Sequence, residues 1–146
     1  MREKPNNYVS VDFPSRSANE GFARVAIAGF VAQLDPTVDE LAELKTVISE
    51  AVTNCTVHAY KDTIGLIYIT ARYSEDGVIW ITVKDCGCGI DDTATAREPL
   101  YTTCTTGERA GMGFTIMESF SDKLRVVSKP GRGTRLEIYK KISTRS

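Results

Sequence analysis

Long apolar runs and clusters of basic residues are both missing from this sequence, and each absence excludes a class of function. No stretch of the 146 residues is long and apolar enough to span a membrane, and residues 1–7 lack the apolar segment of a signal peptide. The 18 basic residues are balanced by 19 acidic ones and form no run, which argues against binding nucleic acid through bulk charge. The sequence therefore predicts a cytoplasmic protein with no membrane partner and no direct nucleic-acid partner.

Cysteine is also scarce, and its spacing excludes the common cysteine frameworks. The four cysteines are Cys55, Cys86, Cys88 and Cys104. They do not show the paired C-x-x-C spacing of a zinc site. In a reducing compartment they are expected to be free thiols that pack as small, partly buried side chains.

What the chain does contain is enough for one domain. Its composition, 42% hydrophobic and 25% charged, is that of an ordinary globular protein. A chain of this length can bury a core of its own. The sequence shows no internal repeat and no linker, so residues 1–146 are expected to form a single domain.

Alternation of apolar and polar residues predicts five short strands. They are residues 8–13, 66–73, 78–84, 124–128 and 134–140. Pro14 ends the first strand. A turn at Ser74–Gly77 joins the second and third strands into an antiparallel hairpin.

Helical spacing predicts two long helices before that hairpin. The first continues through residues 21–34, with Ser17 or Asn19 as its N-cap. The second begins with a capping box of Thr37 and Glu40 and continues to about residue 60. Its polar stripe consists of Glu50, Asn54 and His58. Residues four apart share one face of a helix, so a carboxylate, an amide and an imidazole lie together where they can hold a metal ion and a reacting hydroxyl.

Glycine-rich segments follow the third strand. The sequence D-x-G-x-G at a strand end, from Asp85 through Gly87 to Gly89, lets a ligand approach the backbone closely. Gly111 and Gly113 open a further helix, where free N–H groups favour phosphate. A short helix is expected at residues 91–98. A mobile lid is expected at about residues 99–110, because that segment has little apolar surface to bury.

Four motifs in a fixed order resemble one family. They are E-x-x-x-N (50–54), D-x-G-x-G (85–89), G-x-G-F (111–114) and G-x-G-T (131–134). This order resembles the GHKL ATP-binding domain of gyrase, Hsp90, histidine kinases and MutL over nearly the whole chain. The resemblance implies the Bergerat fold, an α+β two-layer sandwich. Its sheet would be mixed but mostly antiparallel, with the helices on one face.

The resemblance also implies roles for the matching residues. Asn54 would hold Mg²⁺ and bridge to the phosphates of ATP, and Glu50 would be the general base. Asp85, supported by Thr134, would accept a hydrogen bond from the adenine amino group. Arg109 would reach the γ-phosphate. The other implied nucleotide contacts are His58, Gly87, Gly89, Thr105, Gly111 and Gly113.

Four further stretches narrow the resemblance to the sporulation anti-sigma F factors. They are residues 22–25, 32–37, 49–54 and 111–118. Members of that family are serine kinases that also inhibit a sigma factor. The resemblance therefore implies a sigma factor of the sigma F type and an anti-anti-sigma substrate as partners. It also implies a homodimer, with Arg24 as a contact to the sigma factor.

Three other hypotheses remain. A general-stress anti-sigma kinase would use the same chemistry on another sigma factor. A nucleotide-gated binding module would bind ATP and transfer nothing, although the retained Glu50 argues against it. The ATP-binding half of a sensor histidine kinase needs an acceptor histidine, and the only histidine, His58, lies inside the predicted ATP-site helix.

Overall fold

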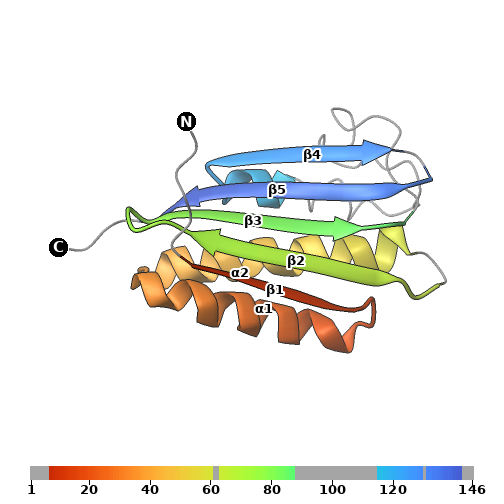
Figure 1. The fold of residues 1–146 in the computed structure, drawn as a ribbon, viewed down its shortest axis with the longest axis horizontal. Helices are drawn as coiled ribbons and strands as arrows, with labels where there is room; N and C mark the ends of the chain where they lie inside the picture. The colour runs from red at the N-terminus through yellow and green to blue at the C-terminus, as the bar shows by residue number, and fades with distance from the viewer. Residues whose placement is uncertain (1–6, 61–62, 88–114, 130, 143–146) are drawn as a thin grey trace.

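The chain folds into two layers in the computed structural model, which describes residues 7–60, 63–87, 115–129 and 131–142. A sheet forms one layer. Helix α2 (Val38–Thr53) runs behind β2 and β3 in Figure 1, and α1 (Ala18–Val31) lies beside β1 along the lower edge. The α+β two-layer sandwich with helices on one face is therefore confirmed. No helix among these described residues is long and apolar enough to cross a bilayer.

The sheet has five strands in the order β1-β2-β3-β5-β4. Their bounds are β1 Asn7–Pro14, β2 Leu66–Tyr73, β3 Val78–Asp85, β4 Lys123–Lys129 and β5 Gly133–Lys141. All four described pairings are antiparallel, so the expectation of a mixed sheet is wrong for this part of the chain. The reason is that β5 returns from β4 as a hairpin and pairs with β3. It thereby separates β3 from β4, which run in the same direction.

The predicted hairpin between β2 and β3 is confirmed. Gly77 has a φ of 86°, which favours glycine, and its N–H donates to the carbonyl of Ser74 at 3.1 Å. Ser74 Oγ also donates to Asp76 Oδ1 at 2.8 Å. The turn chemistry read from the sequence therefore sets the register of the central strands.

The break between the two helices is also confirmed. A 3₁₀ turn, η1 (Ala32–Leu34), follows α1, and Asp35 then adopts a left-handed conformation with a φ of 54°. Helix α2 restarts with the predicted capping box. Thr37 Oγ1 accepts from the Glu40 N–H at 3.0 Å, and Glu40 Oε1 accepts from the Thr37 N–H at 2.8 Å.

The predicted cap of α1 is wrong in its chemistry. Ser17 occupies the N-cap position, but its side chain makes no capping hydrogen bond. Asn19 lies inside the helix, and its Nδ2 donates to the carbonyl of Pro14 at 2.9 Å. The Asn19 side chain thus connects the start of α1 to the end of β1 and does not cap the helix N-terminus.

The second helix does not stay α-helical to residue 60. Helix α2 ends at Thr53, and residues Asn54–Ala59 continue as a π-helix, η2. The N–H of Tyr60 donates to the carbonyl of Cys55, five residues back, at 3.1 Å. Because π-helical hydrogen bonds span one residue more than α-helical ones, the four residues from Asn54 to His58 no longer make one helical turn, whereas the four from Glu50 to Asn54 still do.

The core lies between the sheet and the helices. Every second residue of the central strands is buried there, notably Ile67, Ile69, Ala71, Ile79, Ile81, Val83, Leu136 and Ile138. They belong to one cluster with Ile27, Val31, Leu44, Ile48 and Val52 of the helices. Lys140 is also buried on this side, and its Nζ donates to Glu43 Oε1 at 3.2 Å and to the Phe120 carbonyl at 3.0 Å. Burial of this apolar surface is the main force that joins the two layers.

Some expectations lie outside the described residues. These are the short helix at 91–98, the lid at 99–110 and the glycine-rich helix start at 111–114. Residues 115–119 are helical, as the sequence predicts for the segment that follows.

Candidate functional site

Asp85 is the centre of a buried polar site at the end of β3. Its side chain is 5% exposed. Oδ1 accepts from the N–H of Gly87 at 2.9 Å and from the N–H of Thr134 at 3.2 Å. Oδ2 accepts from the thiol of Cys55 at 3.4 Å. Within the described part of the chain, one carboxylate oxygen is thus held by two backbone amides, while the other has a weak sulfur donor alone.

The carboxyl of Asp85 is electrostatically expensive to bury. Desolvation raises its pKa above the ordinary 3.8, and the hydrogen bonds from Gly87, Cys55 and Thr134 act in the opposite direction. The pKa of the Cys55 thiol is raised well above its ordinary value by burial and by the nearby Asp85 carboxylate. A ligand donor at Oδ2 would complete the carboxylate's hydrogen bonding, which makes Asp85 a candidate binding residue.

Tyr60 fixes the turn that follows Asp85. Its hydroxyl donates to the carbonyl of Leu66 at 2.7 Å and accepts from the N–H of Cys86 at 2.6 Å. The ring is 9% exposed. A Cβ on Gly65 would overlap this ring, so only glycine fits there. Tyr60 therefore connects the end of η2 to the start of β2 and to the residue after Asp85.

The G-x-G-T motif supports the site from the opposite strand. Thr134 pairs with Asp85 in the register of β3 and β5, and its Oγ1 lies 2.8 Å from Ser128 Oγ. Gly133 has a φ of 113°, and a Cβ there would overlap the backbone of Asp85 and Cys86. The glycine thus allows the two backbones to approach closely enough for Thr134 N–H to reach Oδ1.

Glu50 and Asn54 lie one helical turn apart where α2 becomes η2. The N–H of Asn54 donates to the carbonyl of Glu50. Both residues are half-buried. Asn54 Nδ2 is buried, and no partner for it is found among the described residues. The polar side chains therefore lie at the end of the helix that also delivers Cys55 to Asp85.

One amide oxygen at Asn54 would suit Mg²⁺ only if a bound ligand supplied most of the other oxygens. In the described part of the chain, no group of three or more His, Cys, Asp and Glu side chains is placed to enclose a metal. Of the two polar atoms of the Asn54 amide, only Oδ1 could bind a hard cation, because Nδ2 is a hydrogen-bond donor. Mg²⁺ commonly takes one or two protein oxygens and completes its shell with phosphate oxygens and water.

Arg24, predicted as a partner contact, lies between the two helices. Its Nη1 donates to Ser49 Oγ at 3.1 Å and lies 3.8 Å from Glu20 Oε1. The side chain is 41% exposed. The guanidinium is thus held next to the residue that precedes Glu50, with part of its surface open to a partner.

Several predicted site residues fall outside what is described. They are Gly89, Thr105, Arg109, Gly111 and Gly113, together with the side chain of His58. The structure brings together Glu50 and Asn54 on one helical segment, and Asp85, Gly87 and Thr134 at the end of β3.

Sequence reasoning missed two members of this site. In the sequence Cys55 looks like an ordinary apolar residue of the predicted second helix, and its thiol contact with a residue 30 positions away leaves no local pattern. Tyr60 reads as the end of the helix. The sequence gives no sign that its hydroxyl would bind the Leu66 carbonyl and the Cys86 N–H, because both hydrogen bonds depend on the π-helical turn that brings Tyr60 there.

Comparison with known proteins places these features in a family. The histidine kinase-like ATPase domain matches residues 13–140. An anti-sigma F factor from Caldanaerobacter subterraneus subsp. tengcongensis is 52% identical over 137 residues, which are 94% of this chain and 95% of the relative. The anti-sigma F factor of Bacillus subtilis (strain 168) is 49% identical over 138 residues, which are 94% of each chain. The chain belongs to the anti-sigma F factor family.

Two solved structures share the fold at low sequence identity. The RsbU and RsbW domains of Rv1364c from Mycobacterium tuberculosis match with a TM-score of 0.69 and 17% identity, over 97% of this chain and 34% of that one. The histidine kinase domain of the Erythrobacter litoralis EL346 blue-light activated histidine kinase matches with a TM-score of 0.57 and 19% identity, over 84% of this chain and 61% of that one. Since the family is a histidine kinase-like ATPase, the site around Asp85 belongs to a nucleotide-binding domain.

Proposed function

We propose that this protein is a cytoplasmic anti-sigma factor and a serine kinase. It would bind and inhibit a sigma factor of the sigma F type. With ATP and Mg²⁺ it would phosphorylate a serine of an anti-anti-sigma protein. Membership of the anti-sigma F factor family supports the regulatory role. The observation that supports the chemical role is the buried Asp85: among the residues that the structure describes, Oδ1 accepts from two backbone amides and Oδ2 from a thiol alone.

Asp85 would recognise the adenine base. An ionised carboxylate accepts hydrogen bonds only, and the exocyclic amino group of adenine is a donor. Two backbone N–H groups orient Asp85 so that Oδ2 keeps accepting capacity for that amino group. Gly87, and Gly89 beyond the described residues, would let the base lie close to the backbone.

Asn54 would hold Mg²⁺ at the phosphate end of the site. The ion would neutralise phosphate charge, which is the main requirement of phosphoryl transfer. Proposed phosphate contacts outside the described residues are Arg109, Gly111 and Gly113. His58 and Thr105 complete the proposed nucleotide contacts.

Glu50 would act as the general base. Its carboxylate would take the proton of the acceptor serine as the serine oxygen bonds to the γ-phosphorus and the bond to the β-phosphate oxygen breaks. Glu50 precedes Asn54 by one helical turn, and this proximity supports the proposal that a base and a phosphate contact share one helical segment. The products are ADP and a phosphoserine.

The proposed sigma-factor contact and homodimer involve α1. Phe22 and Val25 leave 54% and 66% of their surface exposed on this helix, although both are apolar. Arg24 lies between them in sequence and is held by Ser49. Exposed apolar residues around a fixed arginine are typical of protein interfaces.

A phosphoryl-transfer assay tests the proposal. The purified protein is mixed with γ-labelled ATP, Mg²⁺ and a candidate anti-anti-sigma protein, in parallel with Asn54→Ala. The proposal expects label on a serine of the partner and its loss in the variant. Bound ATP with no transfer by the unaltered protein would instead favour a nucleotide-gated binding module.

A further inference from the structure

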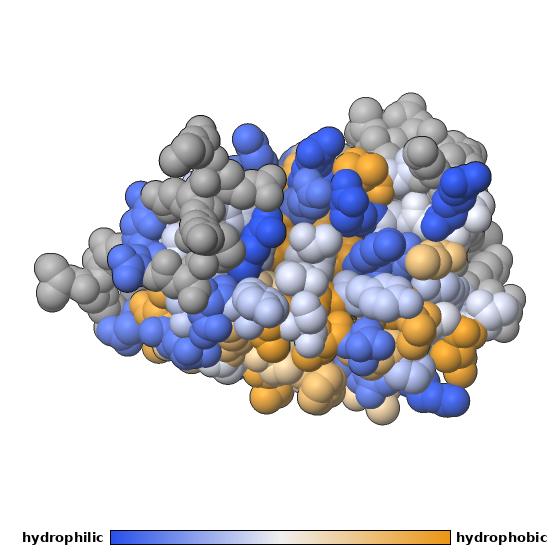
Figure 2. Space-filling view, in the orientation of Figure 1, coloured by the Kyte–Doolittle hydropathy of each residue, from blue (hydrophilic) through white to orange (hydrophobic). Residues whose placement is uncertain are grey.

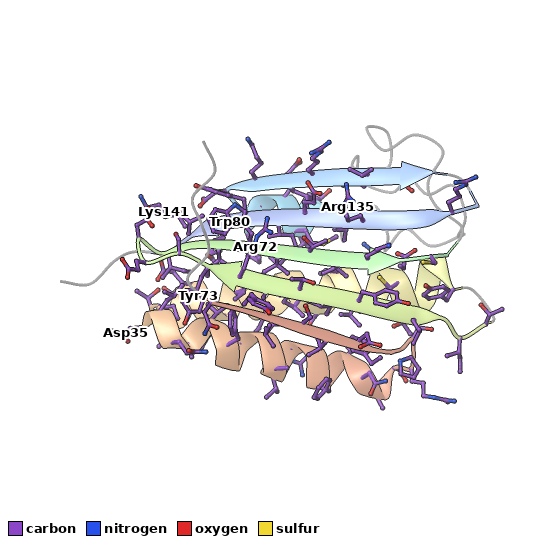
Figure 3. All side chains as sticks on the ribbon, in the orientation of Figure 1. Asp35, Arg72, Tyr73, Trp80, Arg135 and Lys141 are labelled. Carbon is purple, nitrogen blue, oxygen red and sulfur yellow. The ribbon has the colours of Figure 1, made fainter. Side chains whose placement is uncertain are left out.

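The face of the sheet opposite the helices collects basic side chains that are dispersed in the sequence. On that face β2, β3, β5 and β4 align Arg72, Trp80, Tyr139 and Lys123 in one row. The next rows contribute Arg125 and Arg135. Figure 3 shows Arg72, Trp80 and Arg135 on neighbouring strands, and Figure 2 shows hydrophilic side chains over much of the area of β4 and β5.

These residues line a shallow groove, here called the sheet groove. Its volume is about 530 Å³, and its lining includes Arg72, Trp80, Lys123, Arg125, Arg135 and Tyr139. Trp80 and Tyr139 form an aromatic floor with ring centroids 6.2 Å apart and planes at 73°. The guanidinium of Arg72 lies 5.6 Å from the centre of the Trp80 ring. The floor therefore offers both apolar surface and a fixed positive charge.

The groove carries more positive than negative charge. Glu137 is the one carboxylate among its described lining residues, and it forms ion pairs with two arginines. Its Oε1 lies 3.5 Å from Arg125 Nη1, and its Oε2 lies 3.0 Å from Arg135 Nε. Arg125 is 68% exposed and Arg135 is 47% exposed, so both retain donors that face solvent. With Arg72 and Lys123 added, the groove is a positive surface on a chain whose net charge is −1.

We propose that the sheet groove binds an acidic segment of a partner polypeptide. Carboxylates of an extended peptide would pair with the arginine and lysine side chains, and an apolar side chain would pack on Trp80 and Tyr139. Arginine and aromatic residues together are the groups enriched at protein interfaces. The groove lies on the opposite face of the sheet from α2, so this proposal stands apart from the nucleotide site.

The observations favour a peptide over other polyanions and over a second copy of the chain. Glu137 in the middle of the groove would repel a continuous phosphate backbone, and the sequence pI of about 5.9 is far below that of typical nucleic-acid-binding domains. Two copies meeting through this face would bring their surplus positive charges together, which opposes association.

Trp80 gives a direct readout, because it is the only tryptophan in the chain. The probe is an end-blocked nonapeptide of three Glu-Glu-Leu repeats, which has no aromatic residue of its own. The proposal expects a saturable change in Trp80 emission as this peptide is added. It also expects no such change with a Lys-Lys-Leu peptide. Unchanged emission with the acidic peptide would overturn the proposal.

A matched pair of variants separates the groove from general charge. Lys123→Gln combined with Arg125→Gln removes two positive charges from the groove. Arg16→Gln combined with Lys45→Gln removes two from exposed positions elsewhere. The groove variant should weaken peptide binding about tenfold and the control less than about twofold, while both keep the nucleotide affinity of the unaltered protein. Equal weakening in both variants would overturn the proposal, as would tighter binding of an eight-nucleotide oligothymidylate than of the acidic peptide.

Discussion

The thiol of Cys55 donates a hydrogen bond to Oδ2 of Asp85 at 3.4 Å, which connects the π-helix η2 to the end of β3. A thiol is a weak donor, whereas the two backbone amides on Oδ1 are ordinary ones. The carboxylate is therefore oriented through one oxygen and keeps accepting capacity at the other. This asymmetry supports the proposed role of Asp85 as the acceptor of a hydrogen bond from the adenine amino group.

Asp85→Asn tests the proposed adenine contact, because it replaces the hydrogen-bond acceptor Oδ2 with a donor NH₂ group. Asparagine retains an oxygen for Gly87 and Thr134 but places an NH₂ group where Oδ2 lies, so two donors would face each other when adenine binds. ATP affinity should fall by about 100-fold. Inosine triphosphate, which has a carbonyl in place of the amino group, should bind the variant better than it binds the unaltered protein. Titration calorimetry with both nucleotides measures this.

The matched control is Asp12→Asn, at an exposed position of β1. It should leave both affinities unchanged. If Asp85→Asn bound ATP as tightly as the unaltered protein does, Asp85 would not be the adenine contact.

The raised pKa of Asp85 predicts a pH-dependent stability. Burial favours the protonated carboxyl, so the folded state holds this proton at a higher pH than the unfolded chain does. The stability that the protonated Asp85 carboxyl contributes to the folded state is fully present below the ordinary pKa of 3.8. It is lost as pH rises through the raised pKa of the folded state. The free energy of unfolding of Asp85→Asn should therefore increase relative to that of the unaltered protein as pH rises over this window. Urea titrations at a series of pH values would detect it, and a difference independent of pH would contradict the assignment.

The burial of Cys55 predicts its protection from alkylation. Its thiol pKa is raised well above the ordinary value by desolvation and by Asp85, and the side chain is 2% exposed. Since the thiolate is the reactive form, iodoacetamide at mildly alkaline pH should label exposed Cys86 first and Cys55 only after unfolding. Peptide mapping by mass spectrometry distinguishes the two sites. Equal labelling rates in the folded protein would show that Cys55 is accessible.

Tyr60→Phe should damage both stability and the nucleotide site. The change leaves the Leu66 carbonyl and the Cys86 N–H without their partner, at a cost of about 1–3 kcal/mol. Because the Cys86 amide adjoins Asp85, ATP affinity should also fall. Tyr68→Phe, which alters a tyrosine 39% exposed on the open face of the sheet, is the control and should change neither quantity. Normal ATP affinity in Tyr60→Phe would mean that the turn after Asp85 holds without this hydroxyl.

Local chemistry explains which parts of the fold could be predicted. The capping box of Thr37 and Glu40 and the turn ending in Gly77 depend on residues close in sequence, and both are found where expected. The wholly antiparallel pairing of the described strands could not be derived in that way. It depends on β5 inserting between β3 and β4, which is a choice of topology and not of local pattern.

The candidate site divides along the same line. The glycines of the G-x-G-T motif indicate a close approach of backbones, and the register does pair Thr134 with Asp85. The π-helix from Asn54 to Ala59 leaves no such mark, because its sequence spacing also suits an α-helix. The contact between Cys55 and Asp85 and the hydrogen bonds of Tyr60 both depend on that unpredicted turn.

Glu50→Gln is the change that separates binding from chemistry. The glutamine amide has nearly the shape of the carboxylate but cannot take a proton from the acceptor serine. Loss of a general base commonly lowers a rate by about 10²–10⁴-fold. The variant should keep its ATP affinity, since Asp85 and Asn54 are unaltered.

The most direct measurement of the proposed kinase is phosphoryl transfer and ATP binding by Glu50→Gln in the same preparation, with the anti-anti-sigma protein as acceptor. ATP affinity within about twofold of that of the unaltered protein, together with transfer reduced by about 100-fold or more, is the predicted result. Transfer at the unaltered rate would contradict the role of Glu50 as the base and, with it, the proposed mechanism.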